Sequence, residues 1–388
     1  MDAALISGRR VVVDAERPPL DHAAVLVADG AVVTVGPTAE LTAAHPEVVH
    51  HAFPGCTVLP GLIDAHVHLA FEVDRDPVPA LRDADHDVLR ATVADHAAAM
   101  LAAGITSVRD LGDRDGLVAA FRDEVASGSV RGPRVLTAGA PLTPPGGHCW
   151  FLGGEVERDG IRAAVAARAA AGLDVVKVMA SGGMMTPTGP GIADTQFDLP
   201  TLQLVVAAAR EVGLPVAAHA HGTTSIAMAA RAGVDTVEHA GWYGADGGRN
   251  RDDAVAEELA ASGAVTVPTR FRGWPDWPAE ELEAALDRQR WADAHGIPVI
   301  VGNDAGAGRG RFDDLHDALT YYVEVGWTPA QVLAATTCRS ADALGLGDVT
   351  GRLVPGLAAD LLVVDGDPLA DVRALARPRL VCARGRWA

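Results

Sequence analysis

Lysine is almost absent from this sequence of 388 residues: Lys177 is the only one, and all other members of the 32 Lys+Arg are arginines. Lys177 follows Val175-Val176 and precedes Ser181-Gly182-Gly183, a pattern typical of a buried parallel strand that ends in a loop. Burial disfavours an ammonium, and an amine of lowered pKa can do covalent chemistry that a guanidinium cannot. Two interpretations stay open, an ion-paired lysine beneath a loop and an amine that reacts with carbon dioxide to form a carbamate, an anionic ligand able to bridge two metal ions.

Other absences exclude classes of protein. No apolar run approaches the roughly 18 residues of a membrane span, which excludes a membrane protein. The net charge of -19 without a basic stripe excludes nucleic acid and anionic membranes as partners. The N-terminus lacks the basic and apolar regions of a signal peptide. The cysteines lack paired spacing, so we expect no disulfides and a cytoplasmic protein; they are Cys56, Cys149, Cys338 and Cys382.

The middle of the chain, residues 59–350, alternates short apolar strands with alanine-rich helices. Eight such units predict a (β/α)8 TIM barrel, with a doubly wound sheet as the alternative. No glycine-rich nucleotide fingerprint follows any strand. Helices are expected at 161–171, 202–212 and 280–295. The strands are expected at 59–64, 105–108, 134–138, 174–179, 215–219, 234–238, 264–268 and 298–302.

The two ends of the chain, residues 1–58 and 351–388, read instead as short strands separated by turns such as Asp29-Gly30 and Asp365-Gly366. We expect them to form together one small discontinuous β-sandwich domain beside the barrel. The expected strands are 11–13, 24–27, 31–35, 359–364 and 379–382.

Six of the 14 histidines fall where predicted strands end, which is where a barrel carries its reactive groups. His66 and His68 stand at i and i+2, so both imidazoles point to one side of a strand, as in a pair of metal ligands. A lone histidine in such a place is more often an ordinary polar residue. His219, His239, Lys177 and Asp304, at other strand ends, make a metal centre the better interpretation of the whole set.

The segment Pro60-Gly61-Leu62-Ile63-Asp64-Ala65-His66-Val67-His68 resembles the first-strand signature of the amidohydrolase superfamily. The similarity continues through the metal-site residues just named and through 351–360, which is similar to the superfamily's closing turn. The segments 104–110 and 146–148, with the spacing from His219 to His239, resemble the imidazolonepropionase-like and prolidase-like branch.

The resemblance implies a binuclear centre. His66, His68 and Asp304 would bind one divalent ion, His219 and His239 the other, and carboxylated Lys177 would bridge them. Zinc is favoured, and manganese, iron and cobalt also suit such ligands. A hydroxide between the metals would attack the substrate carbonyl, and Asp304 would take its proton and pass it to the leaving amine.

Further residues are candidates for binding the substrate. His148 would hold the substrate carbonyl or the tetrahedral intermediate, the alternative being a loop histidine packed beside Trp150. His221 stands where many relatives have a tyrosine associated with substrate binding, which puts a carboxypeptidase-like specificity in question. Arginines after the seventh strand could clamp a substrate carboxylate. The remaining candidates are Tyr243, Met184, Arg270 and Arg272.

The favoured function is hydrolysis of an amide bond in a small substrate such as a dipeptide, an N-acyl amino acid or a cyclic amide. An esterase, lactonase or organophosphate hydrolase would use the same centre. A mononuclear deaminase would place a glutamate after the fifth strand, where this chain has Gly222-Thr223-Thr224-Ser225. A catalytically retired, metal-free binding scaffold would have lost ligands. The resemblance also implies a homo-oligomer.

Overall fold

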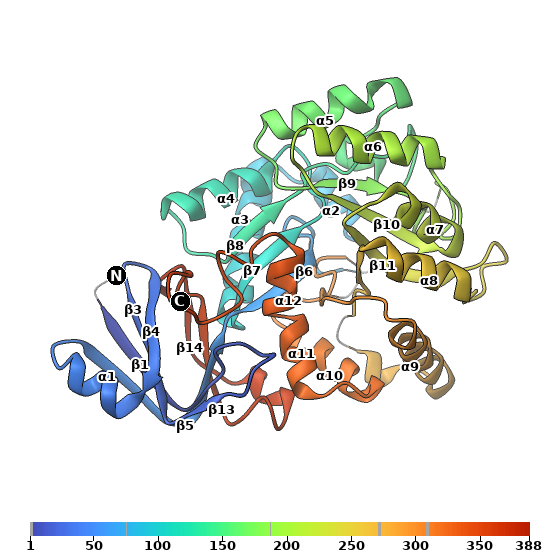
Figure 1. Ribbon diagram of the computed structural model, residues 1–388. Helices are drawn as coiled ribbons and strands as arrows, with labels where there is room; N and C mark the ends of the chain where they lie inside the picture. The colour runs from blue at the N-terminus through green and yellow to red at the C-terminus, as the bar shows by residue number, and fades with distance from the viewer. Residues whose placement is uncertain (1–2, 75, 187, 271–272, 308–309) are drawn as a thin grey trace.

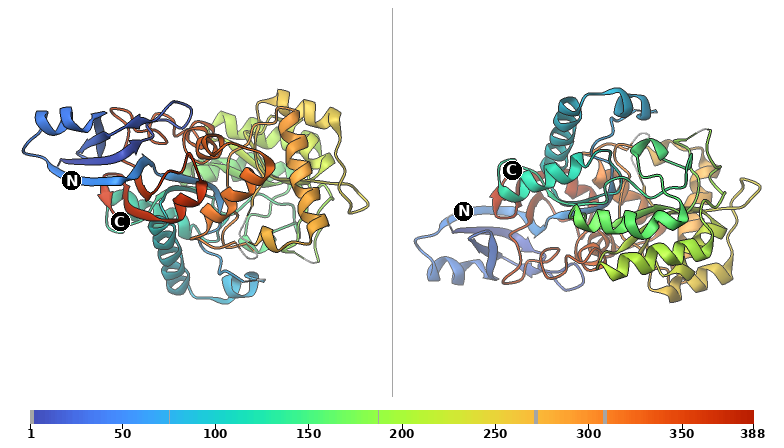
Figure 2. Two further views of the ribbon diagram at one scale, coloured as in Figure 1. Left: turned by 90° about the horizontal axis from the view of Figure 1, so that it is seen from below. Right: turned by 90° about the horizontal axis from the view of Figure 1, so that it is seen from above.

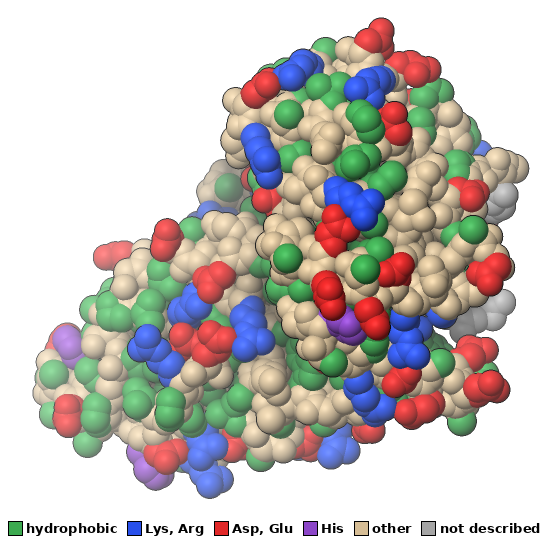
Figure 3. Space-filling view, turned by 45° about the vertical axis from the view of Figure 1, so that its right-hand side comes forward, with side chains coloured by type: hydrophobic (Ala, Val, Ile, Leu, Met, Phe, Trp, Pro, Cys, Tyr) green, Lys and Arg blue, Asp and Glu red, His purple; other side chains and the backbone are tan. Residues whose placement is uncertain are grey.

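The computed structural model describes residues 3–74, 76–186, 188–270, 273–307 and 310–388. It has two lobes, and the smaller lobe contains both ends of the chain (Figure 1). Figure 2 shows the same division from below and from above. Acidic and basic side chains are interspersed over both lobes on the face drawn in Figure 3. Among the described residues, no helix is long and apolar enough to cross a membrane.

The larger lobe is built on parallel strands that follow each other in chain order. Strands β6, β7 and β8 form one sheet, and β9, β10, β11 and β12 form a second. Most of their residues are buried, as expected for strands covered on both faces. The strands are Leu62–Val67 (β6), Ile105–Asp110 (β7), Arg134–Thr137 (β8), Val176–Met179 (β9), Val216–Gly222 (β10), Thr236–Tyr243 (β11) and Val265–Val267 (β12).

Backbone hydrogen bonds join these two sheets into a closed barrel. The N–H of Leu142, after β8, donates to the carbonyl of Lys177 in β9 at 2.7 Å. Across the barrel, residues 298–302 form an isolated parallel bridge with β12, and the N–H of Ala65 in β6 donates to the carbonyl of Val301 at 2.9 Å. The predicted (β/α)8 barrel is confirmed. Its eighth segment is a single bridge and not the regular strand expected; the N–H of Val301 donates to the carbonyl of Ala335 at 3.1 Å and not to β12.

Helices cover the outside of the barrel. The three helices expected from the sequence correspond to α5, α6 and α9. Several helices begin at a capping side chain that accepts a backbone N–H: Asp198 for α6, Asp252 for α8 and Thr328 for α11. The helices of this lobe are Val78–Asp83 (α2), His86–Ala102 (α3), Leu117–Ser127 (α4), Ile161–Ala170 (α5), Leu199–Glu211 (α6), Thr223–Ala232 (α7), Asp253–Ser262 (α8), Ala279–Ala294 (α9), Leu315–Val325 (α10), Pro329–Ala335 (α11) and Cys338–Ala343 (α12), with 3₁₀ turns at Trp150–Leu152, Arg158–Gly160 and Trp274–Asp276.

The smaller lobe combines strands from both ends of the chain in one sheet. The strand order is β15-β14-β13-β5-β1-β3-β4, and β2 pairs with β1. The sequence did not predict helix α1 (Thr38–Ala44) or the strand β5, and the first strand lies earlier than expected. The strands are Ala4–Val11 (β1), Leu20–Asp21 (β2), Ala23–Ala28 (β3), Ala31–Pro37 (β4), Val49–Pro60 (β5), Leu361–Asp365 (β13), Pro378–Ala383 (β14) and Arg386–Trp387 (β15), and a 3₁₀ turn spans Val372–Ala376.

Gly61 connects the two lobes, because it separates β5 of the small sheet from β6 of the barrel. Its N–H donates to the carbonyl of Asp360 at 3.0 Å. A Cβ at Gly61 would lie 2.1 Å from Oγ1 and 2.3 Å from Cγ2 of Thr106, whose side chain is fully buried. Only glycine fits this junction without movement of the barrel wall.

We therefore expect Gly61→Ala to lower the free energy of unfolding by about 1–3 kcal/mol, since the added methyl group overpacks a filled core. Gly55→Ala is the matched control, because no atom lies within 4 Å of a Cβ at Gly55. Its effect should stay within about 0.5 kcal/mol. Urea unfolding followed by circular dichroism measures both, and equal effects of the two substitutions would contradict the prediction.

Candidate active site

A cavity of about 790 Å³ opens at the carboxyl ends of the barrel strands. Every site residue predicted from the sequence lines it, apart from Arg272, which lies outside the described residues. The structure therefore brings together groups that are up to 238 positions apart, from His66 to Asp304. The predicted residues that line it are His66, His68, His148, Lys177, Met184, His219, His221, His239, Tyr243, Arg270 and Asp304.

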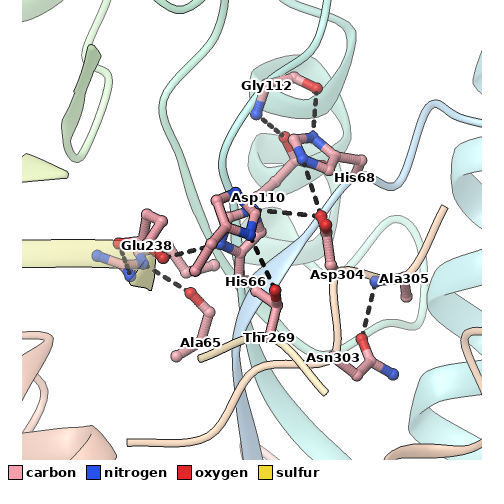
Figure 4. Close-up of polar contacts among 12 residues, drawn as sticks. Ala65, His66, His68, Asp110, Gly112, Glu238, Thr269, Asn303, Asp304 and Ala305 are labelled. Carbon is pink, nitrogen blue, oxygen red and sulfur yellow. Dashed lines mark hydrogen bonds and ion pairs between the residues drawn. The ribbon is translucent and has the colours of Figure 1, made fainter. Parts of the chain in front are cut away.

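His66, His68 and Asp304 form the first of the two groups of possible metal ligands that line this cavity (Figure 4). Oδ1 of Asp304 lies 3.3 Å from Nε2 of His66 and 3.4 Å from Nε2 of His68. Nδ1 of His66 lies 2.7 Å from a carboxylate oxygen of Glu238, and Nδ1 of His68 lies 3.1 Å from the carbonyl of Gly112. Because each Nδ1 faces an oxygen that can only accept, it carries the proton in the neutral form of each ring, and Nε2 then presents a lone pair.

These tautomers test whether a metal ion fits the first group. Two nitrogen lone pairs face a carboxylate oxygen, and Oδ1 of Asp304 is buried without a hydrogen bond. Burial lowers the pKa of His66 to about 4, which keeps that ring neutral near pH 7. Three electron-rich atoms that converge in this way repel each other unless a cation lies among them. The donor set therefore fits a divalent ion.

His219, His221 and His239 form the second group. Nε2 of His219 donates to the carbonyl of Gly182 at 3.1 Å, which leaves its Nδ1 as the free lone pair. Nδ1 of His239 lies 2.8 Å from Oγ1 of Thr269, and the rings of His221 and His239 stack with centroids 4.5 Å apart. The sequence predicts His221 as a substrate-binding residue, whereas the structure brings its ring nitrogen close enough to those of the other two histidines for the three to hold one ion together.

Lys177 lies on β9 inside the barrel. Its side chain is 1% exposed, and Nζ has no hydrogen-bond partner in the described structure. Burial is the largest influence on its pKa, which falls to about 8. Its charge acts on residues of both groups, including His66, His239 and Asp304. Among the described residues no ion-pair partner contacts Nζ, so the ion-paired lysine of the first interpretation is not what the described structure contains.

The sequence interpretation missed a buried charge network beneath the first group. Glu238 accepts hydrogen bonds from His66, from the guanidinium of Arg109 at 2.9 Å and from the hydroxyl of Thr236 at 2.5 Å. Burial alone would raise the pKa of Glu238, but Arg109 and His66 hold it well below its usual range. A signal was present in the sequence, because Arg109 directly follows the predicted strand 105–108 and Glu238 ends the predicted strand 234–238.

The backbone turns His239 toward the site. Neighbouring residues of a regular strand point to opposite faces, yet Glu238 bonds His66 and the His239 ring lies 5.0 Å from the same imidazole. His239 has φ +67°, in the left-handed region that favours glycine. Asp304 has φ +58°. Strained backbone of this kind is concentrated at functional sites.

His148 is 3% exposed and lies beside the second group, with its ring centroid 4.8 Å from that of His219. Its Nδ1 lies 3.2 Å from the hydroxyl of Thr186, and burial lowers its pKa to about 4. Trp150, the alternative packing partner considered for it, is 42% exposed. Met184, at 78% exposed, lies at the rim of the cavity.

Comparison with known proteins supports a family assignment. The model of the amidohydrolase family matches residues 57–388, and that of the imidazolonepropionase-like composite domain of bacteria matches residues 23–47. An ochratoxinase from Aspergillus niger is 27% identical over 96% of this chain and 83% of its own length, and an imidazolonepropionase from Paracoccus denitrificans is 28% identical over 89% and 88%. The crystal structure of a Xaa-Pro dipeptidase with bound methionine superposes over 100% of both chains with a TM-score of 0.88 and 24% identity, which shows the shared fold.

We expect Glu238→Gln to weaken zinc binding by about 10–100-fold, because the amide no longer fixes the His66 ring through a charged hydrogen bond. It should also destabilise the protein by about 3–5 kcal/mol, since Arg109 keeps a buried charge without its partner. Competition with a chromogenic zinc chelator and thermal unfolding measure the two effects. Glu258→Gln, which removes an exposed ion pair with Arg231, is the control; unchanged zinc affinity in Glu238→Gln would refute the positioning role.

Proposed function

The chain belongs to the amidohydrolase family of hydrolases acting on carbon–nitrogen bonds, and from this membership and the site geometry we propose a binuclear metal-dependent hydrolase. Its substrate would be a small amide such as a dipeptide, an N-acyl amino acid or a cyclic amide. The observation that carries the proposal is the position of Lys177, an unpartnered buried amine whose charge acts on both groups of ligand atoms.

The chain's own residues would hold the two ions. Nε2 of His66 and of His68 and the carboxylate of Asp304 would bind one, and His219 and His239 the other, with His221 close to the second group. Lys177, converted to its carbamate, would contribute an anionic oxygen to each. Divalent ions bound there supply a water of lowered pKa and polarise the scissile carbonyl.

Asp304 is the group placed to move the proton. Hydrolysis adds water across the C–N bond, so one proton of the attacking water must reach the leaving nitrogen. Oδ1 of Asp304 has no hydrogen bond and faces the cavity beside both imidazoles of the first group. The carboxylate accepts the proton when water attacks and donates it to the nitrogen as the C–N bond breaks.

His148 is the group placed to orient the substrate. Its lowered pKa keeps the ring neutral near pH 7. The Thr186 hydroxyl accepts the N–H of Cys149 at 3.0 Å and can donate to Nδ1 of His148. That arrangement leaves the ring proton on Nε2, which can donate to the substrate carbonyl oxygen.

Metal loading and substrate assays test the proposal. Protein reconstituted with zinc or manganese should retain about two ions per chain and hydrolyse members of a panel of dipeptides, N-acyl amino acids and lactams. Chelation should abolish hydrolysis, and added metal should restore it. Esters and lactones in the same panel distinguish the esterase alternative. Fewer than about one ion per chain, together with no hydrolysis of any amide or ester, would refute the assignment.

Because Lys177 is the only lysine, its carbamate can be detected directly. Protein loaded with metal in ¹³C-bicarbonate should show one lysine-carbamate signal by ¹³C NMR. Lys177→Ala and Lys177→Arg should both lose that signal, metal retention and hydrolysis, since a guanidinium forms no carbamate. Any carbamate at the N-terminal amine persists in both variants and serves as the internal control. Near wild-type metal content and rates in Lys177→Arg would refute the bridging role.

A further inference from the structure

Three arginines from three different elements line one wall of the cavity. Arg249 follows β11, Arg270 follows β12, and Arg288 lies in α9. Arg288 is 9% exposed, Arg270 is half-buried and Arg249 is exposed at the rim. The three side chains therefore extend from solvent at the rim toward the buried part of this wall.

Within the described part of the chain, none of the three guanidiniums contacts a carboxylate. Nε of Arg270 is buried without a partner, and the side chain of Arg288 makes no hydrogen bond or ion pair with any described residue. The guanidinium carbon of Arg270 lies 4.9 Å from the ring centroid of Tyr321. That of Arg249 lies 3.7 Å from the ring of Tyr243, and the same guanidinium donates to a backbone carbonyl. Aromatic faces orient these charges but do not neutralise them.

The acids that line the cavity in the described structure are engaged elsewhere. Asp304 faces the histidines of the first group, and Asp76 accepts the N–H of Val78. Burial, and then the charges of Arg270 and Arg249, lower the pKa of Arg288 to about 9. The wall is therefore a local concentration of positive charge that the protein does not balance.

This arrangement differs from that of several other arginines in this chain of net charge -19, which pair with carboxylates. Buried Arg109 pairs with Glu238. On the surface, Arg231 pairs with Glu258, and Arg352 makes two bonds to Asp342. A buried charge without a partner is destabilising, so a cluster of such charges in a cavity indicates a site for anions.

We propose that Arg249, Arg270 and Arg288 bind the substrate and that the substrate is a dianion, an amide carrying two carboxylates such as an N-acyl dicarboxylic amino acid. The inference rests on the proposed function and specifies its substrate class. The planar guanidinium of one arginine can form two parallel hydrogen bonds with one carboxylate. One carboxylate would leave two of the three charges without a partner, whereas two carboxylates can engage the whole wall.

Calorimetric titration with glutarate and with its monoamide, glutaramate, tests the proposal without any turnover. In the metal-loaded wild-type protein, glutarate should bind roughly tenfold or more tightly than glutaramate, because one amide replaces a charged hydrogen-bond partner. Arg288→Gln should reduce this preference to less than about threefold. Arg231→Gln, which removes an exposed cation outside the cavity, should keep the full preference.

Equal binding of the two ligands to the wild type would overturn the proposal. So would a preference that persists in Arg288→Gln, because it would come from the metal ions alone. Arg288→Gln should also keep or raise the melting temperature, since it removes a buried charge that has no partner; a large drop would indicate a structural role and overturn the assignment. In the hydrolysis assay, N-acetyl-glutamate should be preferred over N-acetyl-glutamine. Failure of all hydrolysis with intact glutarate selectivity would refute the proposed function and leave this site standing.

Discussion

The hydrogen bond between Glu238 and His66 is the interaction on which the candidate active site depends. Glu238 has no exposure to solvent, and its charge is balanced inside the barrel by Arg109. Because this carboxylate accepts from Nδ1, His66 must present Nε2 to Asp304. The barrel interior thus sets the tautomer of a ring at its mouth. The same carboxylate interacts electrostatically with Lys177 on the neighbouring side of the barrel, so one buried charge influences the first ligand group and the amine.

Local backbone strain provides a second constraint. His239 and Asp304 belong to opposite groups of possible ligands, and both adopt left-handed backbone that residues with a Cβ rarely take. Such conformations persist only where the surrounding fold imposes them. Hydrogen bonds that close the barrel hold one of these residues in place: the N–H of Asp304 donates to the carbonyl of His66 at 2.9 Å. Convergence of the ligand atoms therefore follows from the closure of the barrel.

The electrostatic balance of the cavity is a third constraint on the site. Inside the barrel, Arg109 and Glu238 balance each other's buried charge. At the cavity the protein leaves two sets without partners in the described structure. The first holds electron-rich ligand atoms, exemplified by Oδ1 of Asp304, and the second holds the guanidinium of Arg270, whose Nε is buried without a partner, and that of Arg288 near it. The two sets have opposite preferences, one for cations and one for anions, and they line one cavity. The proposed metal centre and the proposed anion site would therefore face the same substrate.

The sequence by itself determined the fold class and predicted His66, His68, His219, His239 and Asp304 as candidate ligands, because strand periodicity and the placement of histidines at strand ends are local properties. Those properties also marked Lys177 as a buried amine. Only the tertiary structure decided which groups meet: that Glu238 orients His66, that His221 stacks on His239, and that Arg249 and Arg288 join Arg270. The first physical reason is that the direction of a side chain depends on backbone turns, such as the one at His239. The second is that Arg109 and its ion-pair partner Glu238 are 129 positions apart, so barrel closure and not any local pattern brings them together.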